Sequence, residues 1–286
     1  MKEITLNELK KIELDILIDV AEFCDKKKLR YYLGGGTLLG AVRHNGFIPW
    51  DDDIDINMPR PDYDIFIHTY NGYNRNYYVK SIEIDKNYWR TFAKVFDSRT
   101  CIIENAIRIN TPDNAVFIDI FPIDGLPNCK IKQIIFFKEQ EFLNFLYHGS
   151  AWNYTKSFKY RDSKSRFSNM KGIIRTILKF IAISILYPLP THKLIKFINE
   201  NAKKHEFNNS RFIGAIVDCA HGGSCERFLK EKYLPRLKFS FEGKKFYGPM
   251  CFDEYLTNLY GNYMDMPPEN KRVSHHDFKA FWKDKE

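Results

Sequence analysis

The chain has 286 residues, of which 44% are hydrophobic and 28% charged, a balance that excludes a disordered protein and allows a sizeable core. Its formal net charge of +8 favours an anionic partner such as a nucleotide or an acidic lipid headgroup. No helix-turn-helix, zinc-finger pattern or basic stripe interleaved with aromatics is found, so we do not expect nucleic acid as a partner.

The N-terminal segment indicates a helix rather than a signal peptide. It contains no apolar stretch of the signal-peptide kind, so a cytoplasmic location is the default expectation. Thr5 and Glu8 have the spacing of a capping box, and apolar residues then recur at helical intervals up to about Lys28. We expect an amphipathic helix packed on a sheet, followed by a short strand over residues 31–33.

That strand would deliver a glycine turn, formed by Gly34, Gly35, Gly36 and Thr37, and a short helix would open directly from it. Glycines let the backbone approach an anion closely, and the free N–H groups at a helix start favour negative charge. The pattern therefore predicts contacts from Gly35, Gly36 and Thr37 to a phosphate. An ordinary tight turn is the alternative interpretation.

An acidic segment follows, in which alternation with period two predicts a strand carrying Asp53 and Asp55 on one face and Ile54 and Ile56 on the other. Two ionised carboxylates about 4 Å apart repel by roughly 4 kcal/mol at an effective dielectric constant near 20, so the pair needs a cation. Oxygen ligands of this kind suit Mg²⁺ or Mn²⁺. The alternative is a solvated acidic loop, and the roles of Asp51 and Asp52 stay open.

After prolines that end this strand, residues 62–70 predict a helix, and residues 77–84, 92–96 and 101–104 predict strands of a mixed or antiparallel sheet. Lys94 lies on the middle one of these three strands. It is a candidate for phosphate binding if it shares a sheet face with the aspartates. A solvated surface lysine is an equally good interpretation.

Residues 116–124 form a strongly apolar strand that contains Asp119. A carboxylate buried in such a strand is costly unless it faces a metal or another cation. Asp119 is therefore our candidate for the third acidic ligand, whereas Asp124, followed by Gly125, is interpreted as a turn residue and is the next candidate.

The stretch GGGTLLGAVRHNGFIPWDDDIDINMPRPDY resembles the signature of the LicD family, the bacterial phosphocholine transferases related to fukutin, within the nucleotidyltransferase-like fold. The glycine pair of that fold corresponds to Gly35 and Gly36, and its Asp-apolar-Asp strand corresponds to Asp53 and Asp55. The family's Asp-Ile-Phe-Pro segment is matched from Asp119 onward, and the resemblance resumes in the YGNYM and PPENKR segments near the C-terminus.

The second half of the chain changes to long, basic, helical patterns. Residues 132–147 predict a helix, residues 152–169 a substrate lid or a disordered loop, and residues 253–260 a helix that Gly261 closes. Residues 171–189 are apolar with a basic edge, which predicts either a helix lying on an anionic membrane surface or a buried core helix. Among the six cysteines, Cys219 and Cys225 with His221 between them suggest a metal site less well than an ordinary loop.

We therefore expect one α+β domain, with a nucleotidyltransferase-like mixed sheet over residues 1–130 flanked by helices and a mostly helical half over residues 131–286. The resemblance implies a transferase that moves phosphocholine from CDP-choline to a hydroxyl of a glycan or glycolipid precursor in teichoic acid, lipopolysaccharide or capsule. Asp53, Asp55 and Asp119 would be the catalytic and metal-binding residues. The expected substrate contacts come from Gly35, Gly36, Thr37, Arg43, Trp50, Lys94, Tyr260 and Tyr263.

Two alternatives remain at this stage. The same fold could carry a nucleotidyltransferase that moves a nucleoside monophosphate onto a small molecule or a protein. It could also serve as an inactive binding scaffold, although every acidic position that the chemistry needs is filled.

Overall fold

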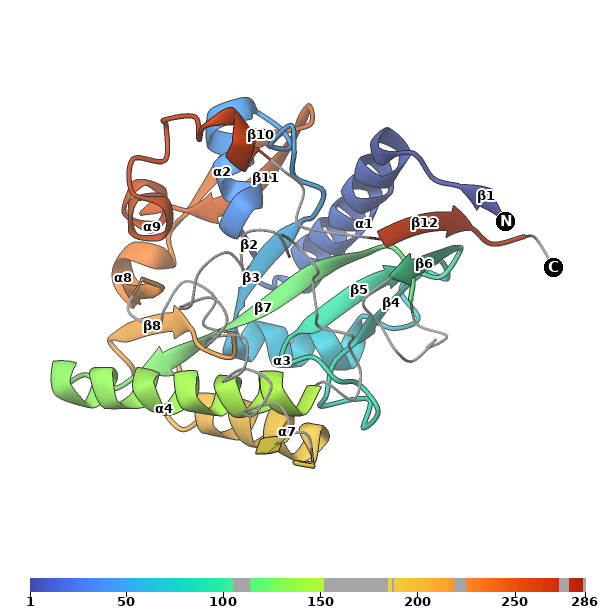
Figure 1. Cartoon of the computed structure of the whole chain (residues 1–286). Helices are drawn as coiled ribbons and strands as arrows, with labels where there is room; N and C mark the ends of the chain where they lie inside the picture. Colours follow the sequence, from blue (N-terminus) through green and yellow to red (C-terminus); the bar gives the residue numbers. More distant parts are fainter. Residues whose placement is uncertain (105–113, 152–184, 187, 219–224, 273–277, 285–286) are drawn as a thin grey trace, which may run out of the picture.

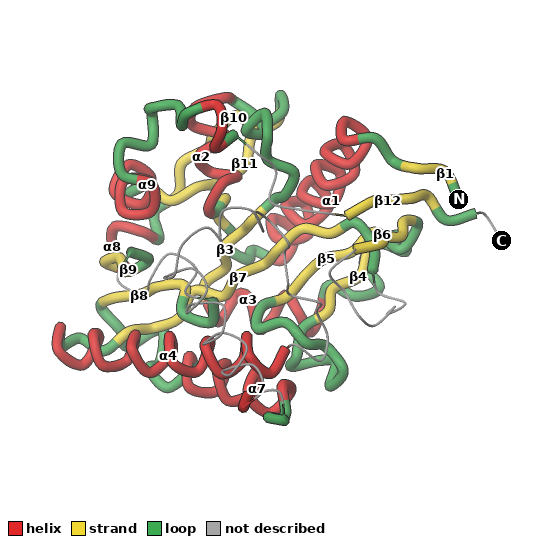
Figure 2. The backbone as a smooth tube through the Cα atoms, viewed as in Figure 1, coloured by secondary structure: helices red, strands yellow, loops and turns green. Residues whose placement is uncertain are grey.

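The computed structural model describes residues 1–104, 114–151, 185–186, 188–218, 225–272 and 278–284. Their largest element is a mixed sheet in the order β2-β3-β7-β5-β4, to which β8 and β9 are added beside the second half of β7. Its strands are β2 (Tyr32–Leu33), β3 (Asp55–Pro59), β4 (Tyr77–Lys80), β5 (Ala93–Asp97), β7 (Phe117–Leu126), β8 (Phe212–Ala215) and β9 (Arg227–Leu229). β3 and β7 run parallel, and the other paired strands are antiparallel (Figures 1 and 2).

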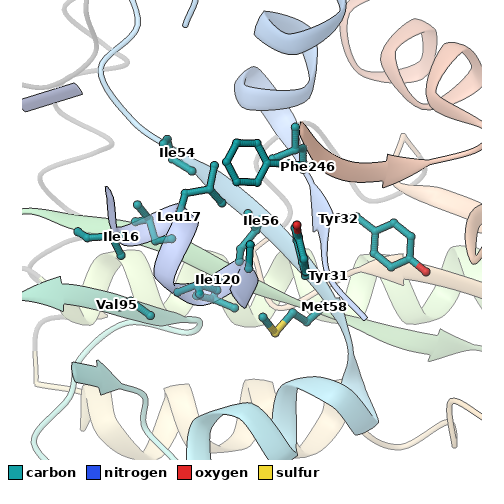
Figure 3. Packing of buried hydrophobic residues seen from close by; sticks show 14 of the residues in the cluster. Ile16, Leu17, Tyr31, Tyr32, Ile54, Ile56, Met58, Val95, Ile120 and Phe246 are labelled. Carbon is teal, nitrogen blue, oxygen red and sulfur yellow. The ribbon is translucent and has the colours of Figure 1, made fainter. Parts of the chain in front are cut away.

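One face of this sheet is covered by α1 (Leu6–Lys27) and α3 (Arg60–Thr69). The predicted capping box of α1 is confirmed, because Thr5 Oγ1 accepts from the Glu8 N–H while the Glu8 carboxylate accepts from the Thr5 N–H. Figure 3 shows Ile16 and Leu17 of α1 packed on β3 and β7. This is the largest hydrophobic cluster of the described residues, and it holds β3 and β7 against α1 and α3.

The other face is covered in part by α4 (Lys130–Ser150) and α7 (Thr191–Ala202), which lie side by side in Figure 1. They enclose a second apolar cluster with Phe92 and Phe121, whose ring centroids are 4.3 Å apart. Both sheet faces are thus buried near β7, as expected of a central strand.

The prediction of a mostly helical half over residues 131–286 is wrong, because after α4 and α7 the described residues from Phe212 onward are mainly strands. β10 (Arg236–Phe241) and β11 (Lys244–Pro249) form a hairpin, and β12 (Phe278–Trp282) pairs with both β1 (Lys2–Glu3) and β6 (Thr100–Glu104). The hairpin turn uses Glu242 at φ 49° and Gly243 at φ 72°, which matches the twist of paired strands. The helices here are α8 (Lys230–Tyr233), α9 (Phe252–Tyr260) and a 3₁₀ turn at Glu269–Lys271, and Gly261 closes α9 as predicted.

Two further expectations need correction. Asp124 is not a turn residue; it lies inside β7, is 1% exposed, and accepts two hydrogen bonds from the Arg60 guanidinium, at 2.6 and 2.7 Å. The strand over residues 101–104 exists, but it belongs to the separate sheet with β1 and β12. Both differences arise from partners that are distant in the sequence: Arg60 for Asp124, and β12 for the strand over residues 101–104.

Several expectations lie outside the described residues: the loop over 152–169, nearly all of the basic-edged segment 171–189, and the pair Cys219 and His221. Within the described ranges, no helix combines the length and the apolar character needed to cross a bilayer.

Candidate active site

The glycine turn lies directly against the acidic segment. Gly34 caps α2 (Gly35–His44), and Gly35 has a φ of 43°, a left-handed conformation that glycine adopts without strain. A Cβ atom on Gly35 would lie 2.7 Å from Asp55 Oδ2, and one on Gly36 would lie 2.6 Å from Asp51 Oδ2. The turn therefore requires glycine for both reasons: backbone conformation and the close approach of carboxylates.

Two backbone hydrogen bonds fix Asp55 as the first residue of β3. Its N–H donates to Thr37 Oγ1 at 2.8 Å, and its carbonyl accepts from the Gly34 N–H at 3.0 Å. The prediction that Asp53 belongs to the same strand is wrong, because Asp53 precedes this anchor and lies in a loop. Thr37 thus positions the strand through its hydroxyl oxygen, and its predicted contact with a phosphate stays a prediction.

Asp55 and Asp119 are neighbours across the parallel ladder of β3 and β7, and Lys94 on β5 is the next partner of Asp119. Partner residues in a sheet point to the same face, so the three side chains form a row across three strands. Lys94 Nζ lies 2.7 Å from Asp119 Oδ1 and 3.2 Å from the centre of the Phe117 ring. The alternative of a solvated surface lysine is therefore wrong for Lys94, which is 5% exposed.

The acidic groups raise one another's affinity for protons. Burial raises the pKa of Asp55 well above its ordinary value, and the charges of Asp53, Asp119 and Asp51 add to this while Lys94 opposes it. On α1, burial raises the pKa of Glu13 well above its ordinary value, and Asp53 and Asp52 raise it further. The site is thus an accumulation of negative charge that a bound cation would relieve.

A pocket of about 600 Å³ opens in front of these carboxylates. Its lining includes Gly36, Leu39, Arg43, Ile48, Trp50, Asp51, Asp53, Asp55, Tyr260, Asn262, Tyr263, Asp265, Met266, Pro267 and Pro268. Of the predicted site residues, Gly35, Thr37, Lys94 and Asp119 are not part of this lining.

Arg43 is the basic residue of this lining. Its Nη1 donates to the carbonyl oxygens of Tyr263 and Asp265, at 2.7 and 3.2 Å, and so holds the loop after α9 against α2. Burial lowers its pKa. No ion pair with a carboxylate is found for it among the described residues, which leaves its charge for an anionic ligand.

The aromatic wall of the pocket comes from Trp50, Tyr260 and Tyr263. The Arg272 guanidinium lies 5.6 Å from the Trp50 ring centre, and the Tyr263 hydroxyl donates to Asp253 Oδ1 at 2.7 Å. Burial, with the nearby Tyr255 and Asp55, raises the pKa of Tyr260 well above its ordinary value, so its ring meets the pocket with a neutral hydroxyl.

The chemistry of the carboxylates suits a divalent ion, but no group of three His, Cys, Asp or Glu side chains in the described part of the chain is arranged to hold one unaided. Mg²⁺ in phosphate sites is typically held by one or two carboxylates together with the phosphates of the substrate. Asp53 and Asp55, both facing the pocket, fit that pattern. The role of Asp119 as third ligand stays a prediction.

Sequence reasoning missed the residues that support the glycine turn. The Tyr255 hydroxyl accepts hydrogen bonds from the Gly35 N–H at 3.0 Å and from Asn57 Nδ2 at 3.3 Å, while Asn57 Nδ2 also lies 3.2 Å from the Tyr233 hydroxyl. Asn57 could have been suspected, since it continues the polar alternation after Asp53 and Asp55. Nothing in the local pattern around Tyr255 or Tyr233 indicates such a role.

A glycine turn that opens a helix beside an Asp-bearing strand of a mixed sheet defines the class of nucleotidyltransferase-like proteins. Residues 28–149 match the family model described as LicD/FKTN/FKRP, nucleotidyltransferase domain. The chain is 32% identical over 289 residues to the lipopolysaccharide cholinephosphotransferase LicD of Haemophilus influenzae, covering 98% of this chain and 99% of that protein. The chain therefore belongs to the LicD family, and it is a transferase of phosphorus-containing groups.

Shorter similarities extend to other proteins. An uncharacterized protein of Rickettsia typhi is 41% identical over 63 residues, which is 22% of this chain and 20% of that protein. The human ribitol 5-phosphate transferase FKRP is 57% identical over 30 residues, which is 10% of this chain and 6% of that protein.

Proposed function

We propose that the protein transfers phosphocholine from CDP-choline to a hydroxyl group of a cell-surface glycan precursor. The observation that carries this proposal is the pocket in which Asp53 and Asp55 face Arg43 and an aromatic wall. Similarity along the whole chain to a cholinephosphotransferase supports the choice of headgroup.

The charge of the pocket supports dependence on Mg²⁺ or Mn²⁺. Four aspartates line it, Asp51, Asp53, Asp55 and Asp265, against the single arginine Arg43. A diphosphate donor carries negative charge of its own, so it enters such a pocket favourably only together with cations. When bound by Asp53 and Asp55, a divalent ion would neutralise charge on the donor phosphates and on the leaving nucleotide.

The protein's own groups have separable tasks in this proposal. Gly36 and Arg43 contact the donor phosphates, and the loop held by Arg43 closes one side of the pocket. Asp119 accepts the proton of the acceptor hydroxyl as the phosphoryl group is transferred. Lys94, with its Nζ 2.7 Å from Asp119 Oδ1, positions that carboxylate.

The aromatic wall is the proposed site of the choline headgroup. A quaternary ammonium cannot donate a hydrogen bond and is best held against aromatic faces, at roughly 0.5–2 kcal/mol per ring. Trp50, Tyr260 and Tyr263 present such faces in the same pocket as the catalytic aspartates.

The proposed acceptor is lipopolysaccharide, because the full-length relative is named for that acceptor; a precursor of teichoic acid or capsule is the alternative. Such acceptors are assembled on lipid anchors. We therefore place the protein at the inner face of the membrane, as a peripheral protein.

Release of CMP from CDP-choline in the presence of Mg²⁺ and a glycolipid acceptor tests the proposal. Wild-type protein should release CMP, and Asp55→Asn should reduce the rate at least ~100-fold because a charged ligand is lost. Release of pyrophosphate from a nucleoside triphosphate, with no CMP from CDP-choline, would instead identify a nucleotidyltransferase. Equal turnover of CDP-choline and CDP-ethanolamine would contradict the aromatic headgroup site.

A further inference from the structure

α4 has two apolar faces. One face is buried against α7 and the sheet through Phe136, Phe137, Leu143 and Tyr147. The opposite face exposes five large apolar side chains: Ile131 (69% exposed), Ile134 (53%), Ile135 (62%), Phe142 (60%) and Phe145 (54%). Among the described residues, none covers these five.

The five exposed side chains form one continuous stripe. At about 100° per residue they fall within an arc of roughly 100° on the helix, opposite the buried face. Lys138 lies in the middle of the same arc. Isolated exposed apolar residues are ordinary, as at Leu6 of α1 and Ile65 of α3, but five in one stripe mark an interaction surface.

The charges around the stripe indicate what it contacts. Lys130 and Lys132 are exposed at its N-terminal end, and the exposed Lys138 makes a surface ion pair with Glu141 at 2.6 Å. Glu139 is exposed on the flank opposite Glu141, so among the described residues the unpaired basic charge beside the stripe lies at its N-terminal end. An exposed apolar stripe with lysines at one end is a pattern of helices that lie in the interface of an anionic membrane.

We propose that the outward face of α4 docks the protein on an anionic lipid surface, with the apolar stripe entering the headgroup region and the lysines contacting the lipid phosphates. The helix lies on the membrane rather than crossing it, since no helix of the described ranges has the length and apolar character for a span. The surface differs from the segment 171–189 that the sequence suggested.

The biological purpose of this docking surface rests on the proposed lipid-linked acceptor. The lipid binding itself does not, because it is measurable without turnover. Figure 1 shows α4 at the opposite side of the molecule from α2 and α9, whose residues and following loop line the pocket. A docked protein would therefore act on a sugar held away from the bilayer surface.

The test is co-sedimentation of the full-length protein with vesicles of phosphatidylcholine containing 30% phosphatidylglycerol, at low and at physiological salt. The stripe variant is Ile135→Glu/Phe142→Glu, and the matched control is Ile65→Glu, another half-exposed isoleucine on a helix. We expect wild type and control to bind, and the stripe variant to bind at least tenfold more weakly. Lys130→Gln/Lys132→Gln should weaken binding roughly 25-fold, about fivefold per lysine, and only on anionic vesicles.

Circular dichroism and CMP release with a detergent-dispersed acceptor check that the stripe variant is folded; normal turnover together with lost vesicle binding supports the proposal. Absence of wild-type binding at low salt would overturn it, and so would equal binding by the stripe variant. Sedimentation that shows a wild-type dimer converted to a monomer by the stripe variant would assign the face to a second copy instead. If the wild-type protein binds vesicles but releases no CMP, the proposed function is contradicted and the proposed docking surface is still supported.

Discussion

Lys94 Nζ lies 2.7 Å from Asp119 Oδ1, with the two side chains only 7% and 13% exposed. Removing one partner of a buried ion pair leaves the other charge uncompensated, at a cost of about 3–5 kcal/mol. The row of Asp55, Asp119 and Lys94 therefore contains an internal cation that makes the acidic site tolerable in the metal-free protein.

We expect Lys94→Met to lower the free energy of unfolding of the metal-free protein by about 3 kcal/mol, because Asp119 would lose its cation. Adding Asp119→Asn to this variant should restore part of the loss, since the uncompensated charge is then gone. Urea unfolding of the two single variants and the double variant measures the coupling. Simple additivity of the two single effects would show that the pair does not interact.

Mg²⁺ should stabilise the wild-type protein against heat. At ten times its dissociation constant a bound ion contributes about 1.4 kcal/mol, which corresponds to a rise in Tm of about 3 °C for a chain of this size. Asp55→Asn should abolish the rise, whereas Asp265→Asn, which changes a lining residue in the loop after α9, should retain it. A rise that persists in Asp55→Asn would place the ion elsewhere.

Gly35→Ala should inactivate the enzyme, with a fall of at least ~100-fold in kcat/KM. The new methyl group would lie 2.7 Å from Asp55 Oδ2, in addition to the strain of a φ of 43°. Gly72→Ala is the matched control, because Gly72 has a φ of 90° with nothing within 4 Å of the added Cβ. It should cost only about 1–2 kcal/mol of stability and keep activity; equal inactivation by both variants would implicate backbone strain alone.

Tyr255→Phe should reduce kcat/KM by roughly tenfold or more, because the Gly35 N–H and Asn57 Nδ2 would lose the hydroxyl that accepts from them. Tyr70→Phe is the control for stability: its hydroxyl donates to Asp19 Oδ1 at 2.6 Å, on the α1 and α3 side. Both variants should melt earlier than wild type. Only Tyr255→Phe should lose activity per folded molecule.

Glu13 predicts a pH dependence of stability. Its pKa is raised well above the model-peptide value of 4.5, so between those two values the folded state binds more protons than the unfolded state. The stabilising contribution is complete below pH 4.5 and is lost as the pH rises toward the raised value. In EDTA, Glu13→Gln should therefore lose less stability than wild type between pH 5 and pH 8.

The stability of Glu13→Gln should still fall as the pH rises, with a smaller slope than in wild type, because the pKa of Asp55 is also raised. Thermal melts across this pH range supply the measurement. A steeper slope in Glu13→Gln than in wild type would contradict the assignment.

The elements whose signals are local could be predicted from the sequence. The capping box at Thr5, the glycine turn before α2 and the apolar strand around Asp119 depend on neighbours within a few residues. The prediction failed for Asp124, because its partner Arg60 lies 64 positions away. It failed for the C-terminal strands because β12 is defined by pairing with β1 and β6.

In the candidate site, too, the residues of a local motif could be predicted and the contacts between distant segments could not. Asp53, Asp55 and Arg43 were predicted from their motif, and the structure brings them to one pocket. The register that places Lys94 beside Asp119 is a property of three strands together, and the Tyr255 hydroxyl reaches Gly35 across 220 positions. Period and composition carry no information about such contacts.

The pairing of β12 between β1 and β6 has a consequence for biosynthesis. A growing chain presents β1 and β6 long before residues 278–282 have been translated, so these two strands remain edges with unsatisfied backbone groups for most of synthesis. Their pairing is among the last events of folding. A nonsense mutation that removed residues 278–282 would leave the catalytic row intact yet yield a polypeptide prone to aggregate through the β6 edge.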